Sequence, residues 1–330
     1  MSAGQGEFSS FWLGELSRTY IKGDKNQVFL QRFLLGISFL CNMEQLDYIK
    51  NYVSIPSGSY LRGNEFPNLE EFMKELELQG YNDVDPNWYP REFPRHQVII
   101  SNPFKMAQTL VTNLEFFDFM EERGYVPTVL KNGKFSKWLQ SQHKWEETPI
   151  SREYFKNNAS DNPNCPVTGV SWIDALAYAK FLREITGLDC TLPTEAQWEY
   201  VARDGSSDIF PVKTKSGRWE GSLDEIAWNT RNSEGKTHPV SQKRTNSFGV
   251  YDMLGNVWEW CLDSFNEDEY KTLGRSTKDS QRITDERNKS LKGGSYLDYA
   301  RSLRPADRFG FDMDSGSDDI GFRLIIRPSS

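Results

Sequence analysis

A six-residue stretch, Gly255-Asn256-Val257-Trp258-Glu259-Trp260, constrains the fold of this chain more than any other part of its sequence. Glycine and asparagine tolerate a positive φ, so the first two residues predict a tight turn. Trp258 and Trp260 are two residues apart, which on a β-strand places both indoles on one face. Each ring can be buried there if its N–H finds a partner. Glu259 then points to the other face or towards a cation.

Length and charge narrow the class of protein. A chain of 330 residues suffices for one large domain with an appendage, or for two domains. The net charge of −8 argues against nucleic-acid binding, which normally needs a basic face. No apolar run approaches the roughly 18 residues of a membrane span, and the N-terminus lacks the basic and apolar regions of a secretory signal. We therefore expect a cytoplasmic protein that binds neither nucleic acid nor membrane.

The cysteines indicate free, partly buried thiols. They are widely spaced and form no C-x-x-C pair, unlike a disulfide framework or a zinc site: Cys41, Cys165, Cys190 and Cys261.

Residues 1–52 predict a helical N-terminal segment. Apolar residues at helical spacing indicate a short helix near residues 8–16 and a second to about Asn42, which begins with a capping box at Asp24 and Gln27. The large apolar side chains of these helices must be covered. Either they pack on the main domain, or they dock a partner or a second copy of the chain.

Residues 53–330 predict the main domain. Strands are expected at 53–55 and 60–61, around a Pro-Ser-Gly turn, and at 97–100. An acidic amphipathic helix is expected at 68–79. Thr112, Ser171 and Thr194 each predict the N-cap of a helix. Residues 130–165 read as a long surface excursion and residues 204–247 as mostly loop.

An ordered set of motifs carries a family resemblance. Phe248–Trp260 resembles the signature of the formylglycine-generating enzyme (sulfatase-modifying factor) family. Further motifs follow the order of that family: Ile55–Gly63, Val170–Ala175, Leu192–Tyr200, Ala227–Ser233, Gly293–Tyr296 and Gly321–Arg323. The resemblance spans about residues 53–327. It implies an α+β fold, an elaborated C-type lectin-like domain with much irregular backbone.

The copper chemistry of that family lacks its ligands here. Its members bind copper through two cysteines beyond the Gly-Gly-Ser element and oxidise a peptidyl cysteine to formylglycine. Thiolates suit Cu(I) because both are soft. The matching positions hold Asp298 and Leu303, and no cysteine follows Cys261. We therefore expect no copper and no formylglycine-generating activity.

Iron is not expected either. Sulfoxide synthases carry a similar domain, but their iron needs three histidines, supplied largely by a separate helical domain. The histidines of this chain, His96, His143 and His238, have no ligand spacing with one another. A metal-dependent oxidoreductase with an unrecognised metal site stays as an alternative function.

Structural calcium is a candidate cofactor. The resemblance implies calcium at the Gly-Asn-x-Trp-Glu-Trp loop and at an upstream asparagine-containing loop. Asn256 and Glu259 offer side-chain oxygens and Val257 a carbonyl, while Asn229 and Asn232 are candidates for a second site. In the alternative reading, Asn256 only occupies the turn and Glu259 is hydrogen-bonded to backbone.

The C-terminal stretch, residues 293–324, is the most informative about function. Arg301, Arg304, Arg308 and Arg323 suggest a scaffold, and the residues between them mix aromatic, acidic and small side chains that suit adaptable binding. This layout resembles the variable proteins of diversity-generating retroelements, which present a mutable ligand-binding surface near the C-terminus. The candidate ligand-binding positions are Tyr296, Leu297, Asp298, Tyr299, Ser302, Pro305, Asp307, Phe309, Gly310, Phe311, Asp312, Ser315, Gly316, Ser317 and Asp318.

The sequence therefore predicts a non-catalytic protein that binds a protein or other macromolecular ligand. An acidic, aromatic surface around Tyr299, Phe309, Phe311 and Asp312 favours a partly basic or apolar partner. A fixed loop on a pseudo-enzyme, in which the arginines pair only with local carboxylates, is one alternative. A structural assembly subunit held together by residues 1–50 is another.

Overall fold

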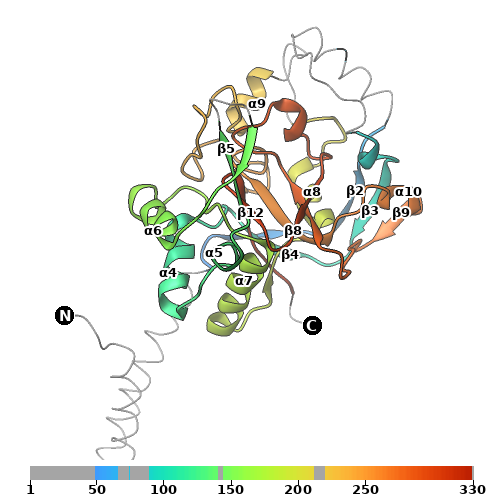
Figure 1. Ribbon diagram of the computed structural model, residues 1–330. Helices are drawn as coiled ribbons and strands as arrows, with labels where there is room; N and C mark the ends of the chain where they lie inside the picture. Colours follow the sequence, from blue (N-terminus) through green and yellow to red (C-terminus); the bar gives the residue numbers. More distant parts are fainter. Residues whose placement is uncertain (1–48, 66–73, 75–88, 140–143, 212–219, 329–330) are drawn as a thin grey trace, which may run out of the picture. The chain divides into compact units, whose positions relative to one another are not determined.

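The computed structural model describes residues 49–65, 74, 89–139, 144–211 and 220–328 (Figure 1). The chain divides into two units, residues 1–50 and 51–330. The elements below belong to the second unit. The helices predicted within residues 1–52 lie outside the described residues, and so does the helix predicted at 68–79, apart from Lys74.

Four small sheets make up the β-structure of the described residues. The first has the order β1 (Tyr52–Ile55), β4 (Phe104–Ala107), β14 (Ile325–Ile326), β7 (Cys190–Thr191), and the second β11 (Phe309–Asp312), β10 (Asn288–Lys292), β8 (Trp258–Ser264), β13 (Ile320–Gly321). The third has the order β12 (Gly316–Ser317), β5 (Phe135–Leu139), β6 (Lys144–Glu147), and the fourth β2 (Gly58–Arg62), β3 (His96–Ile100), β9 (Ser276–Lys278). The strands predicted around the Pro-Ser-Gly turn and at residues 97–100 are confirmed as β1, β2 and β3.

Three helices begin where the sequence predicted. Thr112, Ser171 and Thr194 are the N-caps of α4 (Asn113–Arg123), α7 (Trp172–Thr186) and α8 (Glu195–Arg203), each with a complete capping box. The other described helices are α5 (Thr128–Asn132), α6 (Arg152–Asp161), α9 (Glu220–Ile226), α10 (Glu269–Thr272) and the 3-10 turns η2 (Pro90–Glu92) and η3 (Ala300–Leu303). None of the described helices has the length and apolarity needed to cross a membrane.

The prediction of a surface excursion over residues 130–165 is wrong. This region contains α5, the β5–β6 hairpin and α6, and Phe135 and Phe155 are buried. Its polar composition hid these elements because the two strands are short and β6 is fully exposed. Residues 204–247 are mostly loop in their described part, with α9 as the exception.

The core lies between the central sheets and α8. Trp198 of α8 and Trp260 of β8 are fully buried. α4 packs against α6 and α7 on the side of the unit away from the β2–β3–β9 sheet (Figure 1). The mixture of short strands, helices and irregular backbone confirms the predicted α+β class. Cys165, Cys190 and Cys261 are free and buried, as predicted for the described cysteines.

Candidate ligand-binding surface

Three buried arginines attach the C-terminal segment to the rest of the domain. Each makes a bidentate pair with a distant glutamate: Arg304 with Glu92, Arg308 with Glu195 and Arg323 with Glu259, at 2.6–2.8 Å and across 212, 113 and 64 residues of sequence. Such forked pairs fix both distance and orientation. The predicted arginine scaffold is therefore confirmed for these three residues, while the alternative of purely local pairing is wrong.

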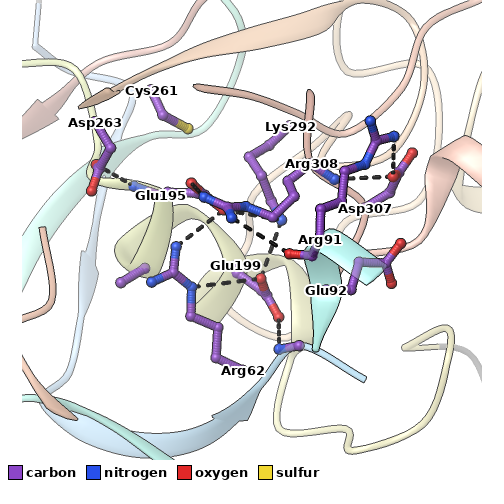
Figure 2. A network of polar contacts seen from close by, with 12 residues as sticks. Arg62, Arg91, Glu92, Glu195, Glu199, Cys261, Asp263, Lys292, Asp307 and Arg308 are labelled. Atoms are coloured by element: carbon purple, nitrogen blue, oxygen red, sulfur yellow. Dashed lines mark hydrogen bonds and ion pairs between the residues drawn. The ribbon is translucent and has the colours of Figure 1, made fainter. Parts of the chain in front are cut away.

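A buried ionic network surrounds the second of these pairs (Figure 2). Arg62 Nη2 lies 3.1 Å from Glu195 Oε1, and Lys292 Nζ lies 3.1 Å from Glu199 Oε2. Burial alone raises the pKa of Glu195, but the charges of Arg308, Arg62 and Lys292 hold it well below its ordinary value. The carboxylates thus stay ionised and the C-terminal segment is firmly tied to α8.

The residues between the arginines divide into accessible and buried positions. Tyr299 is 44% exposed and Phe309 43% exposed. Eight further predicted positions are half-buried: Leu297, Asp298, Ser302, Gly310, Phe311, Asp312, Ser315 and Asp318. We call these ten residues the C-terminal surface.

The remaining five predicted positions are buried, so their assignment to an accessible surface is wrong. Tyr296 is covered, and its hydroxyl donates to the Asp318 carbonyl at 3.5 Å. Asp307 pairs with Arg91 at 3.1 Å. Pro305 lies in the buried run that carries the arginine scaffold. Gly316 and Ser317 form β12, which pairs with β5.

Burial raises the pKa values of three aspartates in the C-terminal segment, Asp298, Asp318 and Asp319. Asp298 accepts hydrogen bonds from Ser295 N–H and Oγ at 2.9 and 2.8 Å, and the buried Asp319 accepts one from Ser317 Oγ at 2.7 Å. Burial, with the nearby Asp298 charge, raises the pKa of Asp319 to about 7. Burial likewise raises the pKa of Asp318 to about 6. Their raised pKa values mark a site where negative charge is poorly compensated.

The Gly-Asn-x-Trp-Glu-Trp stretch forms the predicted turn and strand. Gly255 and Asn256 have φ values of +75° and +63°, and Trp258 and Trp260 are both buried on β8. Trp260 Nε1 donates to the Val170 carbonyl at 3.0 Å, which supplies the partner that a buried indole requires. The Glu259 carboxylate is held by the Arg323 guanidinium.

The predicted calcium ligands already have other partners. Asn256 Oδ1 accepts the His238 N–H and Glu259 is paired with Arg323. Asn229 Oδ1 and Asn232 Oδ1 also accept backbone N–H groups. Calcium binding stays a prediction. The structure adds one candidate calcium ligand that the sequence did not indicate. Asp252 Oδ1 is buried and has no hydrogen-bond partner.

The two positions that match the copper ligands do not fit a soft metal. Asp298 presents a hard carboxylate that is engaged by Ser295. Leu303 is a fully buried hydrocarbon in the main apolar cluster. Copper therefore has no pair of thiolate ligands at these positions.

Sequence reasoning missed the ionic network and Asp319. A usable signal was present, because Glu195 and Glu199 are four residues apart on a helix whose inner face carries Trp198. Two carboxylates on such a face must find cationic partners when they are buried. No comparable signal marked Asp319, which lies between β12 and β13, strands that pair with β5 and β8 far away in the sequence.

Comparisons with known proteins agree with this architecture. The sulfatase-modifying factor enzyme 1-like domain family matches residues 41–328. The chain is 29% identical over 314 residues to the formylglycine-generating enzyme of Thermomonospora curvata, covering 84% of this chain and 94% of that one. It is 26% identical over 310 residues to the inactive C-alpha-formylglycine-generating enzyme 2 of Bos taurus, covering 83% and 87%.

A solved structure shows the same fold. Variable protein 1 of Treponema denticola superposes with a TM-score of 0.59 at 23% sequence identity, covering 84% of this chain and 95% of that one. The predicted fold, a formylglycine-generating-enzyme-like C-type lectin domain with much irregular structure, is confirmed. On its sequence and its fold alike, the chain belongs to the sulfatase-modifying factor enzyme 1-like domain family.

Proposed function

We propose that this chain is a non-catalytic ligand-binding protein that displays a diversified C-terminal surface, in the manner of the variable proteins of diversity-generating retroelements. One observation carries the proposal. Within residues 296–318, accessible side chains alternate with a buried scaffold that is anchored by bidentate ion pairs. The accessible positions can change while the scaffold keeps the backbone in place.

The comparisons support this function without deciding it. A protein of the same fold is described as a variable protein, and one relative is described as inactive. Asp298 and Leu303 also support a non-catalytic function, since they stand where the family resemblance implies two copper-binding cysteines. The ligand is a protein or other macromolecule, because Tyr299 and Phe309 offer rigid contact area on an open surface.

The locus that encodes the chain provides the first test. A reverse transcriptase gene beside a near-copy of the segment for residues 293–323, differing mainly at adenines, is the expected finding. Substitutions should fall on the C-terminal surface and spare Arg304, Arg308 and Arg323. Variation spread evenly over buried and accessible positions would overturn the proposal of a diversified surface.

The competing function is a metal-dependent oxidoreductase, favoured by the formylglycine-generating enzymes among the relatives. Metal analysis of the purified chain separates the two. Stoichiometric copper or iron together with oxygen consumption would establish the enzyme. Calcium alone, or no metal, agrees with the binding protein and with a structural role for calcium.

A further inference from the structure

The third sheet has an open edge. In its order β12–β5–β6, β6 is the last strand, and no described segment of the chain pairs with the other side of β6. All residues of this strand, Lys144–Glu147, are exposed. The unpaired backbone groups of such an edge are a template for a further strand. The sequence of β6 indicates which strand that is.

The hydrogen bonds of the hairpin show which residues of β6 present their backbone groups at the open edge. The carbonyl of Phe135 accepts the N–H of Thr148 at 2.9 Å. The antiparallel register continues this ladder, in which every second residue turns its N–H and C=O towards β5. Glu146 is such a residue. The N–H and C=O groups of Trp145 and Glu147 therefore point away from β5.

A second copy of the chain can pair with this edge about a two-fold axis, which makes the two β6 strands antiparallel. Outward backbone groups must then meet outward backbone groups. If Trp145 lies opposite Glu147 of the other copy, Glu146 lies opposite Glu146. If Glu147 lies opposite Glu147, like charges meet again. When Trp145 lies opposite Trp145, Lys144 lies opposite Glu146, and opposite charges are paired.

The charges of β6 are therefore self-complementary in one register. Charged side chains on an edge strand normally prevent pairing. Here they exclude the neighbouring registers and favour this one, in which the pair of Lys144 with Glu146 occurs twice by symmetry. The hairpin extends the pattern, because Lys137 of β5 lies opposite Glu146 of the same copy. Each Glu146 thus has a lysine on the strand to either side of it.

Aromatic rings on the other face of the hairpin favour the same register. Trp138 lies opposite Trp145, and their ring centroids are 5.4 Å apart. Trp145 is 46% exposed, which is unusual for so large an apolar side chain. In the dimer register the Trp145 side chains of the two copies are neighbours, and the two tryptophan pairs form one row across four strands. Aromatic cross-strand pairs of this kind stabilise a sheet.

We propose that the chain forms a dimer in which the β6 strands of two copies pair antiparallel about a two-fold axis at Trp145, with Lys144 of each copy opposite Glu146 of the other. This inference goes beyond the proposed function and does not depend on it. The sheet that is extended also contains β12 of the C-terminal segment. The dimer therefore joins the two copies through one continuous sheet and presents two C-terminal surfaces, so a partner with repeated sites is bound by both.

Sedimentation velocity of the full chain across a wide concentration range measures the dimer. Lys144→Glu places glutamate opposite glutamate at both symmetry-related pairs and should raise the dimer Kd about tenfold or more. Glu146→Lys places lysine opposite lysine and should act in the same direction. Lys156→Glu is the matched control, because Lys156 is an exposed lysine of α6 outside the sheet, and it should leave the Kd unchanged.

A mixture of the two weakened variants tests the register itself. In a mixed pair, the acidic positions of the Lys144→Glu copy lie opposite the basic positions of the Glu146→Lys copy. The mixture should therefore form a heterodimer about as tightly as the unmodified chain forms its dimer, which a fluorescent label on one variant makes visible. Damage to the hairpin by either substitution would not be repaired by mixing. Thermal melting establishes that the variants are folded, and Lys144→Gln and Glu146→Gln replace any that are not.

The outcomes decide the inference without touching the proposed function. A chain that is monomeric at every concentration overturns the dimer and leaves the edge of β6 for a strand of another protein. A dimer that neither charge reversal weakens, or folded variants whose mixture stays monomeric, overturns the pairing of Lys144 with Glu146. Ligand binding at Tyr299 and Phe309 is a separate measurement that none of these results predicts.

Discussion

At the scale of single residues, the same type of ion pair has different consequences inside and outside the domain. Arg308 is completely buried and serves Glu195 and Glu269, whereas Arg287 pairs with Asp312 on the surface with more than half of its side chain exposed. A buried carboxylate that loses its cationic partner remains desolvated with its charge uncompensated. An exposed carboxylate that loses its partner is hydrated by water instead.

The first prediction concerns these two arginines. Arg308→Met should lower the free energy of unfolding by about 3–5 kcal/mol, because Glu195 loses its bidentate partner in the interior. Arg287→Ala should leave the urea midpoint almost unchanged. Urea denaturation followed by tryptophan fluorescence measures both. Equal effects of the two substitutions would show that the network around Glu195 does not anchor the C-terminal segment.

A second prediction tests the turn before β8. A Cβ on Gly255 would lie 2.1 Å from the Trp228 carbonyl oxygen, and the residue has φ +75°. Gly255→Ala should therefore destabilise the domain by about 3 kcal/mol or more. Gly187→Ala is the matched control, because Gly187 has φ +70° with nothing within 4 Å of its Cβ position. It should cost only about 1–2 kcal/mol of backbone strain.

At the scale of elements, the helix starts differ in how they are stabilised. Thr194 Oγ1 accepts the Gln197 N–H at the start of α8, whereas Ser151 precedes α6 without a side-chain cap bond. Thr194→Ala should reduce stability by about 0.5–2 kcal/mol. Ser151→Ala should change it little. Because α8 carries Glu195 and Glu199, Thr194→Ala should also loosen the C-terminal surface, which hydrogen exchange can detect.

At the scale of the whole molecule, buried carboxylates whose pKa values are shifted in opposite directions set the pH dependence of stability. Burial raises the pKa of Asp263 and of Asp319 to about 7, from an ordinary value of 3.8. Between these values the folded state binds more protons than the unfolded state, so both groups make the free energy of unfolding fall as the pH rises. Glu199 acts in the opposite direction, since nearby cations outweigh its burial and lower its pKa to about 2. Its contribution is lost as the pH falls from its ordinary value towards 2.

We therefore predict greatest stability in acidic solution, near about pH 4, from urea midpoints measured across the pH range. Asp263→Asn keeps the acceptor for the Glu195 N–H and should flatten the decline on the alkaline side. A stability maximum at alkaline pH, unchanged by Asp263→Asn, would contradict the assignment of this decline to buried aspartates.

Local sequence signals predicted much of this fold. Thr112, Ser171 and Thr194 were sufficient to locate three helices, because capping depends on residues within one turn. The β5–β6 hairpin could not be predicted, since its strands are short and β6 is exposed along its whole length. The candidate surface was predicted only in part. Tyr299 and Phe309 are accessible as expected, but Asp307 is buried. Its burial could not be predicted because its partner, Arg91, lies far away in the sequence.

The position of β14 bears on how this protein is made. Ile325 and Ile326 lie between β4 and β7 in the first sheet, so an interior strand is translated only after the whole C-terminal surface. Until then β4 and β7 lack their common neighbour and Glu259 lacks Arg323. Termination or a frameshift anywhere in residues 293–323 removes this strand. Premature termination or a frameshift in this segment should therefore yield an incompletely folded chain that is degraded.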